Sequence, residues 1–212
     1  MDIADMRVDY RCGRLRREDL KIDPIEQFQL WLEEADRAGI TEPTAMSLAT
    51  AGSDGRPLLR TVLLKGFDNR GFVFFTNLES RKARQISENP NVSLLFPWLL
   101  LERQVIVTGS ATKLPVAESV RYFITRPRGS QLAAWASRQS NVISSRRVLE
   151  MEWQRLKHKF GSGQIPLPSF WGGYRVSPLT IEFWQGGHDR LHDRFEYQRQ
   201  PHDSWTIARL AP

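Results

Sequence analysis

Residues 44–77 read TAMSLATAGSDGRPLLRTVLLKGFDNRGFVFFTN, and this stretch decides the fold class. Three strand-like runs, 44–51, 58–67 and 72–77, are separated by the turn sequences GSDGRP and FDNRG. Such runs between Gly- and Pro-containing turns predict antiparallel hairpins. A short helix over 79–89, ended by Pro90, and strands over 91–98 and 102–114 continue the pattern. The region therefore predicts a meander of antiparallel strands that closes toward a barrel.

Helices and further strands are predicted on both sides of this region. Asp23 is a suitable N-cap, Pro24 suits the first helical position, and Gly39 ends that helix. Helices are also predicted over 116–125, 130–137 and 144–160, and strands over 170–176, 180–185, 190–199 and 204–210. The sequence predicts one α+β domain over 21–212 with peripheral helices, preceded by a flexible arm over 1–20 that serves as a lid.

Composition narrows the function classes. No run of about 18 apolar residues exists, the N-terminus does not resemble a secretory signal, and Cys12 is the only cysteine. We therefore expect a cytoplasmic protein without an intramolecular disulfide. The net charge of +6 is compatible with nucleic acid, with a plain basic surface, or with small phosphate esters. Except for Arg14, Arg16 and Arg17, the basic residues are spread in small groups, which disfavours nucleic acid.

Two segments place cations where an anion would stabilise them. Arg60 and Lys65 bracket the apolar strand RTVLLK, and strand alternation predicts that they face opposite sides and two different ligands. In FFTNLESRKA a helix begins with Arg81 and Lys82 in its first turn, where positive charge opposes the helix dipole. An anion bound at that helix start removes the conflict. The alternatives are a strand with solvent-reaching ends and an ordinary surface helix.

Two later segments carry further ligand-binding candidates. In RYFITRPRGSQ, Tyr122 and Arg126 share a helical face, and Ser130 lies near the start of the next helix. Gln139 and Ser140 follow as a polar pair. In FWQGGHDRLHDRF the alternation of Arg190, His192 and Arg194 predicts that they share one face of a strand. The alternatives are a packed Tyr122 with a solvated Arg126, a plain polar loop around Gln139, and a solvated edge strand around His192.

The segment HDRLHD has ligand types suited to a metal, because His188 and His192 are four residues apart beside Asp189 and Asp193. The neighbouring arginines place positive charge beside such a cation, so no metal is predicted. The sequence also has no G-x-S-x-G elbow, Walker loop or dinucleotide-binding glycine pattern.

Taken together, the chain resembles the pyridoxine 5′-phosphate (pyridoxamine 5′-phosphate) oxidase family. The matching stretches are RTVLLK, FFTNLESRKA, NVSLLFPW, LERQV, RPRGSQ, PLPSFWGGYRV, IEFWQGG and RLHDRF. The resemblance implies an FMN-binding split β-barrel, antiparallel and Greek-key-like. It also implies a homodimer with FMN at the subunit interface, and no nucleic-acid or membrane partner.

Carried over by position, the resemblance assigns roles to individual residues. FMN contacts fall on Arg60, Phe75, Thr76, Arg81, Lys82, Gln104, Gln139, Ser140, Trp184 and Arg194, some of them from the second subunit. Substrate contacts fall on Arg7, Tyr10, Lys65, Tyr122, Arg126, Ser130, Arg190 and His192. Of these, Arg190 and His192 are the catalytic candidates, placed against the reacting carbon, and Arg7 and Tyr10 belong to the closing arm.

The implied reaction oxidises pyridoxine 5′-phosphate and pyridoxamine 5′-phosphate to pyridoxal 5′-phosphate by hydride transfer from C4′ to the flavin. Dioxygen then reoxidises the flavin to give H2O2, and the amine substrate also gives ammonia. Two alternative functions are considered. One is that of another split-barrel flavoprotein, such as a flavin reductase or a deazaflavin enzyme, and the other is that of a non-enzymatic carrier of FMN or pyridoxal phosphate. Tyr122, Arg126 and Ser130 disfavour the first rival, because it needs no second phosphate site.

Overall fold

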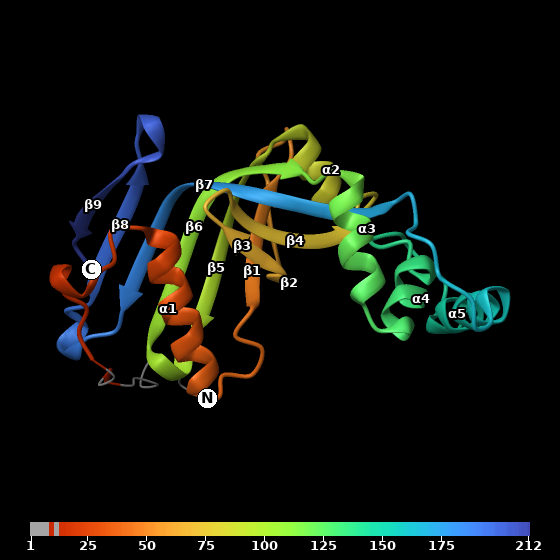
Figure 1. Ribbon diagram of the computed structural model, residues 1–212, viewed down its shortest axis with the longest axis horizontal. Helices are drawn as coiled ribbons and strands as arrows, with labels where there is room; N and C mark the ends of the chain where they lie inside the picture. Colours follow the sequence, from red (N-terminus) through yellow and green to blue (C-terminus); the bar gives the residue numbers. More distant parts are fainter. Residues whose placement is uncertain (1–8, 11–12) are drawn as a thin grey trace.

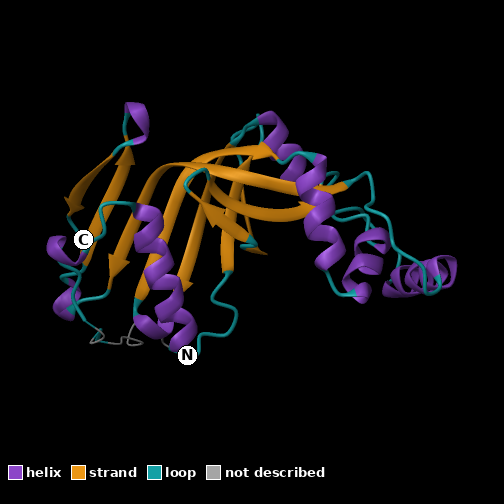
Figure 2. Cartoon of the chain, viewed as in Figure 1, coloured by secondary structure: helices purple, strands orange, loops and turns teal. Residues whose placement is uncertain are grey.

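The computed structural model describes residues 9–10 and 13–212, so the candidate Arg7 lies outside the described residues. Within them, nine strands form one curled antiparallel sheet (Figures 1 and 2). The central order is β2-β1-β5-β6-β7-β4-β3, and β8 extends from β7 to β9. The bounds are β1 Ala45–Ala51, β2 Pro57–Leu63, β3 Gly66–Asp68, β4 Gly71–Asn77, β5 Asn91–Trp98, β6 Arg103–Lys113, β7 Trp171–Gln185, β8 Asp193–Arg199 and β9 Trp205–Leu210. The predicted α+β split-barrel class is confirmed.

The α-helices flank this sheet as the caps and periodicity predict. Their bounds are α1 Pro24–Arg37, α2 Arg81–Glu88, α3 Val116–Thr125, α4 Arg128–Ala136 and α5 Arg146–Phe160. At α1 the Asp23 carboxylate accepts the Ile25 N–H at 2.7 Å, the expected N-cap bond. Helix α1 lies across the sheet, whereas α3, α4 and α5 gather at the opposite end of the molecule from β8 and β9 (Figure 1).

The main core lies between α1 and the sheet. Phe28 of α1 is fully buried and makes edge-on contacts with Phe72 of β4 and Phe96 of β5, with ring centroids 4.9 Å apart in both pairs. Burying an aromatic side chain of this size contributes about 1.5–3 kcal/mol. A smaller cluster, centred on Phe123, Leu132 and Leu156, joins α3, α4 and α5 to the start of β7. The helical end therefore has its own packing, and that packing holds α3 and α4 beside the sheet.

Strand β7 corrects one prediction. The sequence predicts two strands, 170–176 and 180–185, whereas the structure has one strand of 15 residues that runs through Pro178. Pro178 is tolerated because it faces Gly109 at a register shift with β6. A Cβ on Gly109 would lie 2.1 Å from the Ser177 carbonyl oxygen, so only glycine fits there. Residues 171–176 of β7 pair with β4, and residues 180–185 pair with β8. The partner strand along this edge of β7 therefore changes midway, and the barrel is split at that point.

The predicted strand over 58–67 is also wrong, because the chain changes partners at Leu64 and Lys65. The Leu64 N–H donates to the Thr44 carbonyl on the β1 side, and the Lys65 N–H donates to Val73 of β4. Strand β2 consequently ends at Leu63, and the short β3 begins at Gly66. Lys65 lies in this break, so simple strand alternation no longer sets its direction relative to Arg60.

The segment 190–199 differs from its prediction as well. Strand β8 begins only at Asp193, and residues His188–Arg190 form a tight turn. Asp189 and Arg190 both have left-handed backbones, with φ of 53° and 62°. Such a conformation cannot continue a strand. Of the three residues expected on one strand face, only Arg194 is in the strand.

The described part of residues 1–20 is packed on the body of the protein. Leu15 and Leu20 are buried in the main core. The Leu15 N–H donates to the Asp193 carboxylate at 3.0 Å, which ties the segment to the start of β8. Among the helices that the structure describes, none is long and apolar enough to cross a membrane.

Candidate active site

The sheet and the helical end enclose a cleft of about 370 Å³, which we call the cation cleft. Strand β4 supplies Phe75 and Thr76, helix α2 supplies Lys82, and the break after β2 supplies Lys65. Seven of the sequence-predicted residues line it together: Lys65, Phe75, Thr76, Lys82, Tyr122, Arg126 and Gln139. Residues far apart in sequence thus converge as the resemblance implies.

Lys82 is the buried cation of the cleft, with 9% of its surface exposed. Its Nζ donates to Gln139 Oε1 at 2.8 Å and to Thr76 Oγ1 at 3.1 Å, both neutral oxygens. Burial, together with the nearby charge of Arg60, lowers the pKa of Lys82 to about 8. A buried ammonium without a carboxylate is unfavourable by itself, and an anion would stabilise it.

The start of α2 strengthens this positive field. Ser80 caps the helix by accepting the Ala83 N–H, and the first turn has no acidic residue. The Arg81 N–H donates to Ser140 Oγ at 3.2 Å, so the loop after α4 reaches this helix start. Ser140 has a left-handed backbone with φ of 72°, which turns the loop there. The helix dipole, Arg81 and Lys82 all favour an anion at this end.

Arg60 is held beside this helix by a network that sequence reasoning missed. Its guanidinium donates to Thr50 Oγ1 at 2.6 Å and to the Leu48 carbonyl at 3.1 Å. Gln85 Oε1 accepts from Thr50 at 2.6 Å and from Arg60 at 3.4 Å. Burial and the nearby Arg81 lower the pKa of Arg60. Thr50 and Gln85 are 35 residues apart, and no local pattern signals their contact.

A second positive position lies on the helical side of the cleft. The Arg126 guanidinium carbon lies 4.9 Å from the Trp171 ring centroid, a cation–π contact. Its Nη1 is buried and has no hydrogen-bond partner among the described residues. Burial lowers the pKa of Arg126 and raises that of Tyr122. Phe75 stacks on Tyr122 with centroids 4.1 Å apart, which fixes the phenol at the cleft wall.

Ser130 is placed near the cleft without being part of its lining. It lies in the first turn of α4, where its N–H donates to the Pro127 carbonyl at 2.8 Å. Ala134, four residues later, does line the cleft, so the two share a helical face. Its role in binding stays a prediction.

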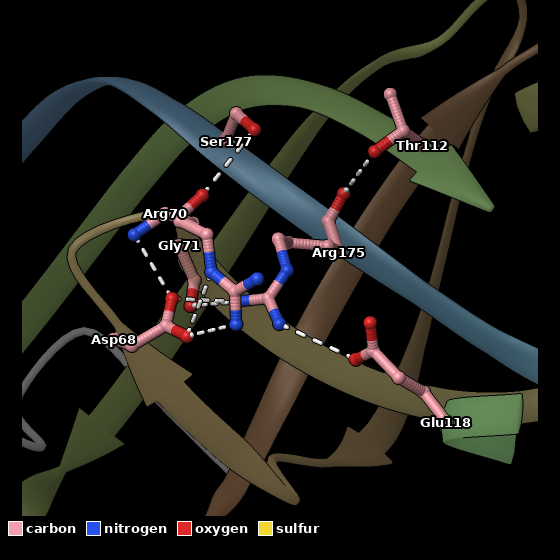
Figure 3. A network of polar contacts seen from close by, with 7 residues as sticks. All are labelled: Asp68, Arg70, Gly71, Thr112, Glu118, Arg175 and Ser177. Carbon is pink, nitrogen blue, oxygen red and sulfur yellow. Dashed lines mark hydrogen bonds and ion pairs between the residues drawn. The ribbon is translucent and has the colours of Figure 1, made fainter. Parts of the chain in front are cut away.

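Behind the cleft, Arg175 of β7 ties three elements together (Figure 3). Its guanidinium donates to Asp68 Oδ1 at 2.6 Å and pairs with Glu118 of α3 at 3.6 Å. Asp68 also accepts from the side chain and the N–H of Arg70, which fixes the β3–β4 turn. Lys65 directly precedes β3 and Tyr122 is on α3, so the network links the two elements that carry these candidate phosphate ligands.

The remaining candidates form a second cluster, which we call the β7–β8 group: Tyr10, Gln104, Trp184, Arg190, His192 and Arg194. Gln104, Trp184 and Arg194 are direct neighbours across β6, β7 and β8. The His192 ring lies 4.7 Å from Trp184 and 5.6 Å from Tyr10. Arg190 is exposed in the turn before β8. Arg194 donates to both oxygens of Glu182, at 2.9 and 3.1 Å.

The two clusters lie at opposite ends of β7 and do not meet within one chain. Trp171 lines the cation cleft at the first position of β7, and Trp184 is thirteen positions later. At about 3.3 Å per residue this corresponds to roughly 40 Å along the strand. In Figure 1 the helical end and β8 accordingly lie on opposite sides of the molecule. No group of three or more His, Cys, Asp or Glu side chains suited to a metal occurs in 9–10 and 13–212.

Comparison with known proteins decides the family. Residues 32–160 match the family model described as pyridoxamine 5′-phosphate oxidase. The chain belongs to the pyridoxamine 5′-phosphate oxidase family. Residues 171–212 match a second model, described as the pyridoxine 5′-phosphate oxidase C-terminal dimerisation region. This region contains β7, β8 and β9 and therefore most of the β7–β8 group.

Relatives named pyridoxine/pyridoxamine 5′-phosphate oxidase match over their whole length. The one from Rippkaea orientalis is 60% identical and that from Vibrio campbellii 58%, with all of both chains covered in each case. Among solved structures, PhzG from Burkholderia lata 383 superposes with a TM-score of 0.88 at 34% identity, covering 93% of this chain and 98% of its own. That structure contains tetrahydrophenazine-1-carboxylic acid. An FMN-binding protein from Nostoc punctiforme shares the fold, with a TM-score of 0.72 at 17% identity over 91% of this chain and 100% of its own.

Proposed function

We propose that this chain oxidises pyridoxine 5′-phosphate and pyridoxamine 5′-phosphate to pyridoxal 5′-phosphate, using FMN and dioxygen. The alcohol reacts with O2 to give the aldehyde and H2O2, and the amine reacts with O2 and water to give the aldehyde, ammonia and H2O2. The observation that carries the proposal is the set of cations around one cleft. Among the described residues, no carboxylate pairs with Arg60, Lys65, Lys82 or Arg126.

This arrangement suits two phosphate esters. Arg60, Arg81 and Lys82 at the start of α2 would hold the FMN phosphate, with Thr76 and Gln139 as neutral partners. Lys65, Tyr122 and Arg126 would hold the substrate phosphate, and the unpartnered Nη1 of Arg126 has a donor to offer. Charge-assisted donors of this kind are the strong contacts for phosphate. FMN, when bound, supplies the two-electron redox chemistry that connects substrate to dioxygen.

We infer that the working unit is a homodimer whose sites each use two chains. The cation cleft of one chain would be completed by the β7–β8 group of its partner, because one chain keeps them at opposite ends of β7. Trp184, Gln104 and Arg194 would then reach the cofactor. Arg190 would orient the substituent on the reacting carbon and stabilise charge that develops there.

The relative PhzG suggests the nearest alternative, a carboxylate-bearing ring as substrate. Lys65, Tyr122 and Arg126 favour a phosphorylated substrate, since three donors around one position suit the oxygens of a phosphate ester. A carrier that binds FMN or pyridoxal phosphate without turnover is the other alternative.

The test is an absorbance spectrum of the purified protein followed by addition of pyridoxine 5′-phosphate under air. The proposal expects flavin bands, oxygen consumption and formation of the aldehyde. Unphosphorylated pyridoxine is the matched control and is expected to react far more slowly at the same concentration. A flavin-containing protein that consumes no oxygen with either phosphorylated substrate would leave the carrier as the better description.

A further inference from the structure

The turn from Gly186 to His192, between β7 and β8, has an unusually constrained backbone. The Gly186 N–H donates to the Glu102 carbonyl at 2.7 Å, and the Leu191 N–H donates to the His188 carbonyl at 2.9 Å. Between them, Asp189 and Arg190 are consecutive non-glycine residues with left-handed backbones. Such conformations persist where the surrounding structure enforces them, and they concentrate at functional sites. The turn therefore presents Arg190 and His192 in defined directions.

One contact inside this turn fixes the chemistry of His192. The main-chain N–H of Gly187 donates to His192 Nδ1 at 3.1 Å. A neutral imidazole has one donor and one acceptor nitrogen. Because Nδ1 accepts, the ring hydrogen is on Nε2. Among the described residues no group is hydrogen-bonded to Nε2, so this N–H is available to a ligand.

The His192 ring also packs against two aromatic rings, which contact each other with centroids 5.7 Å apart. Trp184 lies at 4.7 Å with a 46° tilt, and Tyr10 lies at 5.6 Å with a 68° tilt. Turning the imidazole over would replace the Nδ1 acceptor with a carbon and leave the Gly187 N–H without its partner. The ring contacts hold the imidazole plane, and the hydrogen bond selects its orientation.

Glycine is required at position 187 because space is lacking there, and its backbone conformation is not the reason, since a φ of −135° is open to any residue. A Cβ there would lie 2.4 Å from the Leu191 carbonyl oxygen and 3.6 Å from His192 Cα. A contact of 2.4 Å with backbone cannot be relieved by a side-chain rotation. Any side chain at 187 would shift the turn that carries His192.

We propose that Gly187 is a positioning residue that holds His192 as its Nε2–H tautomer, so that His192 serves the substrate as a hydrogen-bond donor. The inference rests on the proposed function for the identity of the substrate. In this tautomer Nε2 offers a hydrogen to a lone pair beside the reacting carbon. It does not accept the proton that the alcohol or amine loses, and another acceptor takes that proton.

The first test is the tautomer itself, measured by NMR on the FMN-loaded protein labelled with ¹⁵N-histidine. The chain has four histidines, and the His192 signals are assigned by their loss in His192→Gln. The proposal expects Nε2 as the protonated nitrogen and Nδ1 as the acceptor. A hydrogen on Nδ1 would overturn it. This measurement needs no turnover, so it decides the inference even if the proposed substrates turn out to be wrong.

The second test compares two amide replacements. The amide nitrogen of Gln is placed like Nε2, whereas the amide of Asn is placed like Nδ1. His192→Gln is expected to retain roughly tenfold more turnover than His192→Asn, the rate equivalent of one hydrogen bond. If His192 were the proton acceptor, both amides would fail equally, and that result would overturn the proposal. His188→Gln and His188→Asn, in the same turn but exposed, are the controls and should behave alike.

The third test addresses Gly187. Gly187→Ala is expected to lower turnover about tenfold or more and to give His192 a mixed tautomer, while FMN content is retained. Gly66→Ala is the matched control, because a Cβ at Gly66 meets nothing within 4 Å. A Gly187→Ala protein with the wild-type tautomer and wild-type turnover would remove the positioning role.

Discussion

The cation cleft and the β7–β8 group both contain arginines, but they treat arginine charge in opposite ways. Beside the cleft, Arg60 donates to neutral oxygens, and in the cleft lining Arg126 keeps a buried nitrogen without a partner among the described residues. In the β7–β8 group, Arg194 makes two hydrogen bonds to Glu182, and the neighbouring Arg209 pairs with Asp193 at 2.6 Å. The first region is electrostatically incomplete, whereas in the second the strand arginine Arg194 is already paired.

This difference predicts separate roles for the two regions. The cleft binds phosphate groups, and the β7–β8 group orients the groups that react. Incomplete charge favours an anion, so the cleft should control the affinity for phosphate groups. The paired Arg194 gains little from an additional charge, and the value of the β7–β8 group lies in the placement of Trp184, Arg190 and His192. Substitutions in the cleft should therefore change affinity, and those in the turn before β8 should change turnover.

Arg190→Ala should give the largest effect, a loss of turnover without a matching loss of FMN affinity. Removing a donor that stabilises developing charge lowers turnover about 10²- to 10³-fold. FMN affinity should change little, because Arg190 is not among the cation-cleft residues. Steady-state kinetics and flavin titration measure the two quantities, and Arg199→Ala, further along β8, is the control. Equal losses of turnover and FMN affinity would contradict the division.

Lys82→Met should show the opposite pattern. It removes the buried ammonium and should weaken FMN binding about ten- to a hundredfold, the value of a charge-assisted hydrogen bond. Turnover at saturating FMN should fall much less. Arg84→Met is the control, since Arg84 is on the same helix but exposed. Unchanged FMN affinity in titrations of Lys82→Met would remove this lysine from the cofactor site.

The pH dependence of FMN affinity tests the assignment of Lys82 to the cofactor site, with a smaller expected effect. Burial lowers the pKa of Lys82 to about 8, so its charge is present below this pH and lost above it. FMN affinity should fall as the pH rises through about 8, and the decrease should be weaker in Lys82→Met. In the FMN-free protein the unfolded chain binds more protons than the folded one between pH 8 and the ordinary lysine pKa of 10.5. This group alone therefore makes folding stability rise with pH across that window. A flat FMN affinity between pH 7 and 9.5 would argue against a charged Lys82 in the site.

Glu118→Gln should have the smallest effect and tests the support behind the cleft. It weakens the pair with Arg175 and allows α3 to shift relative to Lys65. The KM for the phosphorylated substrate should rise about two- to fivefold, because a partly exposed ion pair contributes under about 1 kcal/mol. Turnover number and FMN affinity should be unchanged. Glu150→Gln, which breaks an exposed pair with Arg146, is the control. A KM equal to that of the control would assign the network to folding alone.

Local signals in the sequence predicted the parts of the fold that local contacts determine. The Asp23 cap and the charge conflict at Arg81 and Lys82 are properties of single helices. Pro178 within β7 could not be predicted, because it depends on Gly109 across the sheet. The partner exchange at Lys65 and the left-handed pair Asp189–Arg190 likewise depend on contacts from distant segments.

In the candidate site, too, some residues could be predicted from the sequence and others depend on contacts that only the structure shows. The resemblance supplied residues that the structure places in two clusters, but it did not supply the side chains that hold them. Thr50 and Gln85 contact each other across 35 residues, Trp171 contacts Arg126 of another element, and Glu182 contacts Arg194 on the neighbouring strand. Gly187 left no signal because its requirement, an absent Cβ, becomes visible only when the Leu191 carbonyl is placed.

The central claim is that one working site takes its cation cleft from one chain and its β7–β8 group from another. It is tested most directly by unfolding and refolding an equal mixture of Lys82→Met and Arg190→Ala chains, at an FMN concentration too low to load the Lys82→Met cleft. Each variant alone should have little activity. Random pairing makes half of the dimers mixed, and one of the two sites in each is then fully native, so about a quarter of wild-type activity should return. If both clusters of a site came from the same chain, every site in the mixture would carry a substitution, and activity would stay at the level of the separate variants.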